Sequence, residues 1–170
     1  MELRDLTLDD RRLYEGLLYD PVVMADLGGP LPPGDVEIKL QRDVVTTAND
    51  ETWISVIVSD DGEAMGSVCI WSVEGDGSGG RPYSEIGWMV LPEFQGRGIG
   101  RWAVGAILDR ARADGRWGVI HAHPGVSNAP SNGICRSLGF TMVETVDVDY
   151  VGRKLTCNHW QIDAGHAGVT

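Results

Sequence analysis

The stretch EFQGRGIGRW, from Glu93 to Trp102, places three glycines at alternate positions just before an apolar pattern of helical period. Glycine is unfavourable inside strands and helices, so this spacing indicates a backbone that side chains forbid or the close approach of a ligand. The run SEIGWMVL (84–91) before it is typical of a strand, which Pro92 ends. From Ile99 onward, apolar residues at 99, 102, 103, 106 and 107 share one helical face. The chain therefore contains a strand, a glycine turn and a helix in direct succession.

A glycine turn that opens a helix is suited to binding an anion. Its free backbone N–H groups converge at the positive end of the helix dipole, where they can hold a phosphate or pyrophosphate. Arg97 and Arg101 add positive charge at this position. The turn is not a Walker loop, because no GKS or GKT follows, and it lacks the GxGxxG fingerprint of dinucleotide-binding folds.

Composition is that of one ordinary globular domain. In 170 residues, hydrophobic side chains make up 42% and charged side chains 23%, which is enough to bury a core. The charged N-terminus and the absence of a long apolar run predict neither a signal peptide nor a membrane anchor. Three widely spaced cysteines without a CxxC pair argue against a disulfide framework and a thiolate zinc site. We expect a cytoplasmic protein.

The negative charge is concentrated at the start of the chain. The net charge is −11, and residues 1–63 carry 15 acidic and 5 basic side chains, against 10 and 9 in residues 64–170. Such a field disfavours nucleic acid and attracts cations. A solvated acidic face that only keeps the protein in solution explains the same pattern equally well.

The remaining sequence alternates strand and helix patterns without an internal repeat, which predicts an α/β domain over residues 1–163. The proline- and glycine-rich segment 20–34 is a long loop, which suggests a functional role. Residues 75–81 are predicted to be a mobile tip, and 164–170 a frayed tail. The predicted strands are 2–7, 52–60, 64–73, 84–91, 117–123, 140–150 and 155–162, and the predicted helices are 8–18, 36–48, one from residue 99, and 128–138.

Two ordered motifs resemble the GNAT superfamily of N-acetyltransferases. QGRGIG (95–100) fits Q/R-x-x-G-x-G/A, the acyl-CoA pyrophosphate loop of that superfamily. NAPSNGICRSLGF (128–140) is similar to its later motif, in which an asparagine precedes a helix that ends in Leu-Gly-Phe. The Asn-x-x-Ser-Asn sequence at the start of this motif is most similar to that of the ribosomal-protein Nα-acetyltransferase branch. The resemblance implies the GNAT fold, a mixed, mostly antiparallel central sheet flanked by helices, with two splayed central strands.

The resemblance also implies acetyl-CoA as the co-substrate and no metal. The backbone of Met89 and Val90, on the splayed strand, would pair with the pantetheine arm, and Arg101 would lie near the phosphates. Asn128 would hydrogen-bond the cofactor from the opposite wall, although a plain helix N-cap is the alternative. The pyrophosphate would be held by main-chain donors of Gln95, Gly96, Arg97, Gly98, Ile99 and Gly100.

Acetyl transfer to an ammonium group requires a proton acceptor, an oxyanion stabiliser and a proton for the departing thiolate. The resemblance implies Glu85 as the base, directly or through water; a solvent-facing strand carboxylate is the alternative. Many family members protonate the thiolate from a tyrosine, but Cys135 occupies that position here. Ser131, which matches a serine of the ribosomal-protein branch proposed to act at the thioester, is the replacement we favour. Cys135 itself is a possible proton donor, but on a short helix we interpret it as a small core residue.

His121 and His123 lie two apart on one face of a predicted strand, and Asn-His recurs at 158–159. No third ligand is indicated, so we do not predict a metal site. His121 is interpreted as a packing residue or a proton relay near the cleft.

We therefore predict an enzyme that transfers an acetyl group from acetyl-CoA to a primary amine, directly and in a ternary complex. The acidic N-terminal third favours a cationic small molecule or a peptide N-terminus as acceptor, beneath the segment 20–34. No nucleic-acid or membrane partner is expected. A noncatalytic acyl-CoA-binding regulatory module, favoured by the missing tyrosine, and a structural homodimer subunit are the alternatives.

Overall fold

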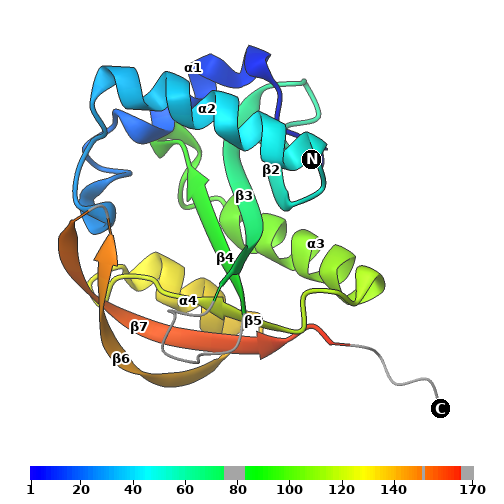
Figure 1. The fold of residues 1–170 in the computed structure, drawn as a ribbon, viewed down its shortest axis with the longest axis vertical. Coiled ribbons are helices and arrows are strands. Elements are labelled where there is room, and N and C mark those ends of the chain that lie inside the picture. Colours follow the sequence, from blue (N-terminus) through cyan, green and yellow to red (C-terminus); the bar gives the residue numbers. More distant parts are fainter. Residues whose placement is uncertain (75–82, 151, 166–170) are drawn as a thin grey trace.

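The computed structural model describes residues 1–74, 83–150 and 152–165. Its strands form one sheet in the order β1-β2-β3-β4-β5-β7-β6 (Figure 1). Within the described residues, every neighbouring pair is antiparallel except β4 and β5. The predicted mixed, mostly antiparallel sheet is confirmed. The strands are β1 Glu2–Asp5, β2 Thr52–Val58, β3 Ala64–Val73, β4 Tyr83–Val90, β5 Val119–Ala122, β6 Thr141–Tyr150 and β7 Arg153–Asp163.

The helices are α1 Arg11–Leu18, α2 Pro33–Ala48, α3 Ile99–Asp114 and α4 Ala129–Ser137. α2 starts inside the predicted loop because Pro33, already without a backbone N–H, is favourable in a first helical turn. α1 starts later than predicted because Leu8–Asp10 forms a 3-10 turn. There the Asp10 carboxylate accepts the Thr7 N–H at 2.8 Å and binds Arg4.

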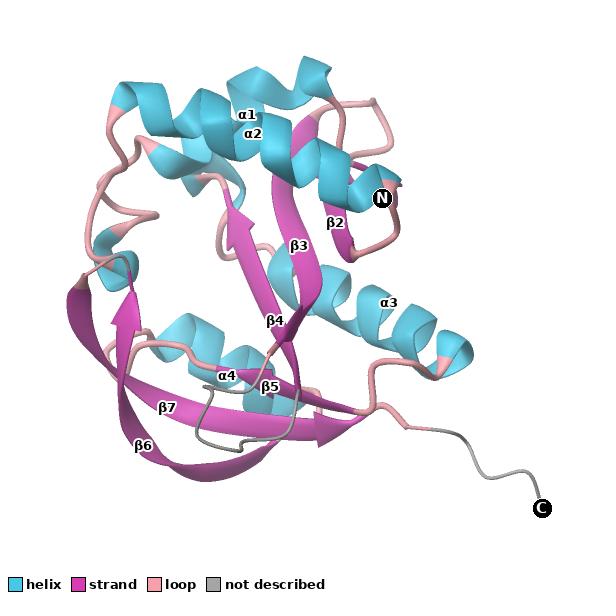
Figure 2. Cartoon of the chain, viewed as in Figure 1, coloured by secondary structure: helices cyan, strands magenta, loops and turns pink. Residues whose placement is uncertain are grey.

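Helices cover the two faces of the sheet in different places, as Figure 2 shows. α1 and α2 pack on one face of the strands β2 to β4, with Leu17, Leu40 and Val56 in their apolar cluster. α3 packs on the opposite face, where Ile70, Ile107 and Trp160 belong to a second cluster that Cys135 of α4 also joins. The sheet is therefore a partition between two apolar clusters.

The sheet splays open at its centre. β4 pairs with β5 only at Ser84↔Ile120 and Glu85↔His121, and the two strands then diverge (Figure 1). On the other side, β4 stays paired with β3 from Tyr83 to Val90. The β5-facing edge of β4 therefore has no strand partner from Ile86 to Val90 among the described residues, and the predicted splay is present.

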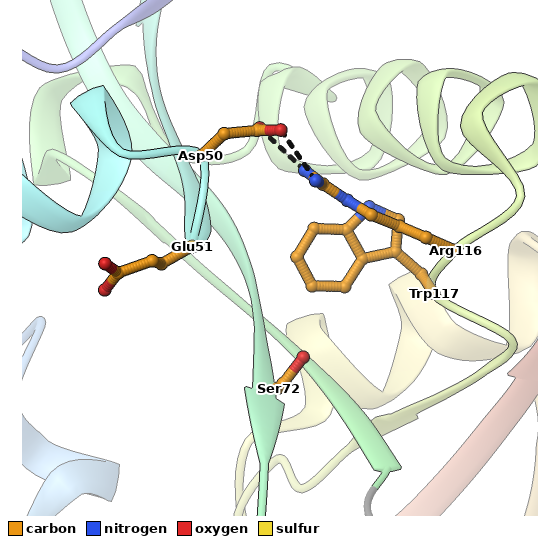
Figure 3. Close-up of a pocket in the computed structure, with 5 residues that line it drawn as sticks. All are labelled: Asp50, Glu51, Ser72, Arg116 and Trp117. Carbon is orange, nitrogen blue, oxygen red and sulfur yellow. Dashed lines mark hydrogen bonds and ion pairs between the residues drawn. The ribbon is translucent and has the colours of Figure 1, made fainter.

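An arginine clamp fixes the end of α3 to the start of β2. Arg116 donates two hydrogen bonds to Asp50, of 2.6 and 2.7 Å, and its guanidinium lies over the rings of Trp53 and Trp117. Asp50, Arg116 and Trp117 line a pocket together with Glu51 and Ser72 (Figure 3). Asp50 has a positive φ of 57°, which aspartate tolerates better than most residues. The Arg116 guanidinium and the Trp53 N–H lower the pKa of Asp50 to about 2.

The ends of the predicted elements agree with the structure only in part. No helix in the described residues is long and apolar enough to cross a membrane. The predicted tip 75–81 lies outside the described residues, as do residues 166–170 of the predicted tail. Ala164, the first residue of that tail, is fully buried and its N–H donates to the Gly118 carbonyl at 2.9 Å.

Candidate active site

The three glycines of the turn have two different purposes. Gly96 and Gly98 adopt φ values of 73° and 78°, in the left-handed region that favours glycine. A Cβ on either would meet nothing within 4 Å, so their outer side is open. Gly100 lies inside the first turn of α3, where a Cβ would approach Ile134 Cδ1 to 3.1 Å. The first two glycines shape the turn, and the third lets α3 pack closely against α4.

The turn presents backbone donors at the start of a 16-residue helix. Gly98 is the N-cap of α3 and provides no side-chain cap, and the first turn holds no acidic residue. Within the described residues, no hydrogen bond is recorded for the N–H groups of residues 96–101, whereas Trp102 N–H already donates to the Gly98 carbonyl. Unpaired donors at the positive end of a helix dipole favour an anion. The turn therefore provides the kind of donors that a phosphate group needs, and the pyrophosphate site stays a prediction.

The open edge of β4 carries the backbone groups of alternate residues. Leu91 N–H donates to Met65 of β3, and a Cβ on Gly66 would strike the Met89 carbonyl at 2.3 Å. Met89 thus directs its backbone toward β3, and strand alternation turns Trp88 and Val90 toward the open edge. Of the two predicted pantetheine contacts, Val90 lies at this edge, whereas Met89 does not. Gln95 Nε2 donates to the Val90 carbonyl at 2.9 Å.

The two arginines of the turn are arranged differently. Arg97 lies over the Phe94 ring, with its Cζ 5.5 Å from the centroid. Arg101 Nε donates to Ser137 Oγ at 3.1 Å, at the far end of α4. Both side chains are exposed. Arg101 is therefore engaged with α4, while Arg97 extends from the turn itself.

The first turn of α4 and its N-cap contain two predicted residues. Asn128 Oδ1 accepts the Ser131 N–H at 3.0 Å, so Asn128 is the N-cap of α4. That was the alternative explanation for this residue, and it leaves the amide Nδ2 of Asn128 available as a donor. Ser131 is half-buried, and no hydrogen bond of its hydroxyl is recorded in the described part of the chain.

Asn132, which sequence reasoning missed, anchors this turn. Its Nδ2 donates to the carbonyls of Gly125 and Asn128 at 2.9 and 2.8 Å. Its Oδ1 accepts from Asn158 Nδ2 and Trp160 Nε1, both at 2.9 Å. The side chain is 2% exposed, and its two donor hydrogens and two lone pairs are all used. The second asparagine of the Asn-x-x-Ser-Asn spelling was the available signal.

A cluster of three histidines lies beside Glu85 where β4 and β5 part, and one of them contacts it. Glu85 Oε1 lies 2.6 Å from His123 Nδ1, and His121 Nδ1 lies 2.6 Å from His159 Nε2. The His159 ring stacks on both other histidines, with centroids 4.9 Å from His121 and 4.8 Å from His123. Tyr83 lies against His121. Glu85 is therefore no lone surface carboxylate, and the His-x-His and Asn-His patterns converge on it.

Burial lowers the pKa of His121, and the neighbouring His159 and His123 lower it further. The pKa of His159 is also lowered, by burial first and then by His123. Since an unfolded histidine titrates at about pH 6.5, the unfolded chain binds more protons just below that pH. These two groups therefore stabilise the fold above about pH 6.5 and lose this contribution as the pH falls below it.

We expect the free energy of unfolding to decrease as the pH falls from about 7 toward 5, more steeply in the native protein than in a His121→Gln, His159→Gln double variant. Urea denaturation followed by tryptophan fluorescence at several pH values measures both slopes. Equal slopes over this window would show that the pair titrates normally in the folded state.

Cys135 is excluded from the chemistry by its position. Its side chain is fully buried in the cluster between the sheet and α3. Desolvation raises the pKa of its thiol to about 12, so the thiolate is not formed near neutral pH. The interpretation of Cys135 as a small core residue is confirmed.

Some carboxylates of the acidic N-terminal third are neutralised away from the site. Asp10, Asp43 and Asp50 are ion-paired with basic residues outside this cluster. Asp26, in the predicted loop, lies nearer, because it accepts a 2.8 Å hydrogen bond from Ser127 Oγ and lies beside Gly125. Segment 20–32 thus reaches the turn before α4. In the described residues, no group of three or more His, Cys, Asp or Glu side chains could hold a metal ion.

An open sheet that splays beside a glycine turn, with a carboxylate at the branch point, has the architecture of an acyl transferase. The acetyltransferase (GNAT) domain family matches residues 1–141. Because this match covers most of the sequence, the chain belongs to the GNAT acetyltransferases, and the family resemblance in the sequence is confirmed.

Solved structures show the same fold. Spermidine N-acetyltransferase from Vibrio cholerae, in complex with CoA and spermine, is 18% identical with a TM-score of 0.77, covering 96% of this chain and 95% of that one. Ribosomal-protein-alanine N-acetyltransferase from Brucella melitensis is 21% identical with a TM-score of 0.74, covering 96% and 99%. The acetyltransferase yncA from Salmonella typhimurium, with acetyl-CoA, is 22% identical with a TM-score of 0.73, covering 100% and 97%. No curated protein sequence matches.

Proposed function

We propose that this protein transfers an acetyl group from acetyl-CoA to a primary amine, directly and in a ternary complex. The observation that carries the proposal is that three features of the candidate site follow one another along β4 and the turn after it. The turn with unpaired N–H groups, the open edge of β4 at Val90 and Trp88, and the Glu85–His123 pair follow one another along a single strand. A phosphate-terminated thioester bound along that edge would bring its acyl end toward the titratable cluster.

The residues of the turn supply the binding part of this proposal. Main-chain donors from Gly96 to Gly100 would hold the pyrophosphate, whereas the Gln95 N–H, which the sequence also offered, donates to the Pro92 carbonyl. Arg97 would add charge where Arg101 is engaged with Ser137. The Val90 backbone would pair with the pantetheine arm, and Asn128 would donate through its free Nδ2. Glu85 would assist removal of the proton from the acceptor amine. Ser131, with an unengaged hydroxyl on α4, would support the leaving thiolate.

The acceptor class follows from charge. A net charge of −11, with Glu85 and Asp26 near the cluster, favours a cationic small molecule or a peptide N-terminus. The Vibrio cholerae enzyme is a spermidine acetyltransferase and the Brucella melitensis enzyme acts on ribosomal-protein alanine, as their names state. Both acceptor kinds therefore belong in the first screen.

That screen follows the release of free thiol from acetyl-CoA in the presence of spermidine, aminoglycosides or peptides with a free N-terminal alanine. Turnover of any amine supports the proposed acetyltransferase activity. Tight binding of acetyl-CoA with no turnover of any amine would instead favour the noncatalytic binding module.

Salt is expected to weaken the acceptor interaction selectively. Raising the ionic strength shortens the Debye length below about 8 Å, so the apparent Michaelis constant of a cationic amine should rise more than that of acetyl-CoA. Steady-state kinetics between low and high salt tests this with spermidine. A neutral acceptor that is used equally well at all salt concentrations would contradict the charge argument.

Ser131→Ala is expected to lower the turnover number by roughly 10²–10⁴-fold, the usual worth of acid assistance, with little change in CoA affinity. Cys135→Ala is the matched control on the same helix and should retain most activity, since the thiol is buried and protonated. Stopped-flow thiol release and calorimetric CoA titration separate the two effects. An acetyl-enzyme seen by intact mass spectrometry that disappears in Cys135→Ala would contradict direct transfer.

A further inference from the structure

The contact between Glu85 and His123 fixes which nitrogen of the histidine carries the proton. Glu85 Oε1 and His123 Nδ1 are 2.6 Å apart, and the two side chains are 21% and 16% exposed. An ionised carboxylate only accepts hydrogen bonds, so the ring must donate, and Nδ1 carries the hydrogen. In the neutral ring, Nε2 then keeps its lone pair.

The Nε2 atom is the unengaged end of this pair. Among the residues that the structure describes, no hydrogen bond to His123 Nε2 is recorded, whereas Nδ1 is held by Glu85. The pair lies where β4 and β5 part, because Glu85 is the last residue of β4 that pairs with β5 and His123 directly follows that strand. The pair therefore lies at the branch point of the sheet, next to the edge of β4 that lacks a strand partner.

We propose that His123 Nε2 is the atom that removes the proton from the acceptor ammonium, and that Glu85 is the positioning residue that orients His123. This inference rests on the proposed function and changes the role of Glu85 from the base itself to its support.

The chemistry of the two groups favours this division. A general base works best when its pKa lies near the working pH, and an imidazole titrates at about 6.5 whereas a carboxyl group titrates at about 4. A carboxylate behind an imidazole holds the required tautomer and stabilises the imidazolium that forms, as in the serine-protease triad. Glu85 lies at His123 Nδ1, where a carboxylate can support the ring in this way.

The neighbouring histidines are neutral enough for His123 to accept a positive charge. The His121–His159 hydrogen bond of 2.6 Å needs one donor and one acceptor, so this pair cannot carry two charges while the bond persists. Burial lowers the pKa of both, so the ring stacked on His123 is neutral at neutral pH. The titratable groups facing the cluster include Tyr83 and Glu85 of β4, His121 of β5, His159 of β7 and Glu144 of β6.

The proton transfer balances without any further reactant. One N–H bond of the ammonium breaks, its proton bonds to His123 Nε2, and the electron pair stays on the amine nitrogen. That nitrogen attacks the acetyl carbonyl carbon, and the carbon–sulfur electron pair leaves with the sulfur. The second proton of the attacking nitrogen passes to the departing thiolate, so that the products are a neutral amide and a thiol. The imidazolium, paired with Glu85, releases its proton to solvent before the next cycle.

The test compares His123→Gln with Glu85→Gln, using acetyl-CoA with spermidine and with a peptide that begins with alanine. We expect His123→Gln to lower kcat by roughly 10²–10⁴-fold and to leave the KM of acetyl-CoA nearly unchanged. Glu85→Gln should lower kcat by a smaller factor than His123→Gln. Added imidazole should restore part of the activity of His123→Ala. Glu51→Gln, at an exposed position, controls for loss of a carboxylate.

The outcomes separate this inference from the proposed function. An active native enzyme with unimpaired His123→Gln and inactive Glu85→Gln overturns the inference and leaves the function standing. No turnover of any amine overturns both. Nitrogen NMR of the ring needs no acceptor: we expect protonated Nδ1 and unprotonated Nε2 in His123 near pH 8, and loss of that preference in Glu85→Gln. The opposite tautomer overturns the inference.

Discussion

Gly98→Val is expected to weaken CoA binding by at least roughly 100-fold, the loss of one or two charge-assisted hydrogen bonds. Gly98 has a φ of 78° and caps α3, and a β-branched residue is a genuine outlier in that conformation. The turn must therefore rearrange, and the N–H groups of residues 96–101 no longer converge. Calorimetric titration of the purified variant with CoA measures the change.

Backbone strain from valine at a positive φ could by itself weaken CoA binding by destabilising the fold. Gly62→Val is the matched control for that effect. Gly62 has a φ of 86° and lies in the turn between β2 and β3, and a Cβ on it would meet no atom within 4 Å. Both variants should lose comparable thermal stability, but only Gly98→Val should lose CoA. Unchanged CoA affinity in Gly98→Val would mean that the glycines only make a tight connection.

Asn132→Ala is expected to cost about 3–5 kcal/mol of unfolding free energy, because each buried polar group left without a partner costs roughly 1–3 kcal/mol. The substitution leaves the Trp160 and Asn158 donors and two carbonyls without this partner. A typical domain is stable by only about 5–15 kcal/mol, so the variant should be measurably less stable in urea.

Asn128→Ala is the control for this prediction. It removes one N-cap hydrogen bond, to Ser131 N–H, and such caps are worth about 1 kcal/mol. The two asparagines lie four residues apart in one motif, so they share the local sequence and differ in burial. Equal losses in the two variants would show that the Asn132 network is not a principal support of α4.

The local elements could be read from the sequence because their signals are local. Periodicity and proline placed β4, α3 and α4 within a few residues, and the glycine spacing indicated the turn before α3. The family motifs supplied the splayed sheet, which no local pattern shows.

The side-chain contacts of the candidate site could not be predicted from the sequence, because they depend on the register between strands that are far apart in the chain. His159 reaches His121 across 38 positions, and Asn132 reaches Trp160 across 28. Likewise, the pairing of Met89 with β3 rather than the open edge depends on strand phase, and a shift by one residue would exchange Met89 with Val90. The charge pattern also misled in part, since several N-terminal acids are neutralised locally.

The Gln95 side chain changes the electrostatic character of the β4 edge. By donating to the Val90 carbonyl at 2.9 Å, it engages an acceptor whose partial negative charge would otherwise lie next to the anion-binding turn. What β4 then presents at its C-terminal end is an N–H without a competing oxygen, which continues the row of donors from the turn onto the strand. In the proposed complex the Gln95 side chain would therefore not bind phosphate; it would occupy the Val90 carbonyl and leave the Val90 N–H as the group that meets the negatively charged donor molecule.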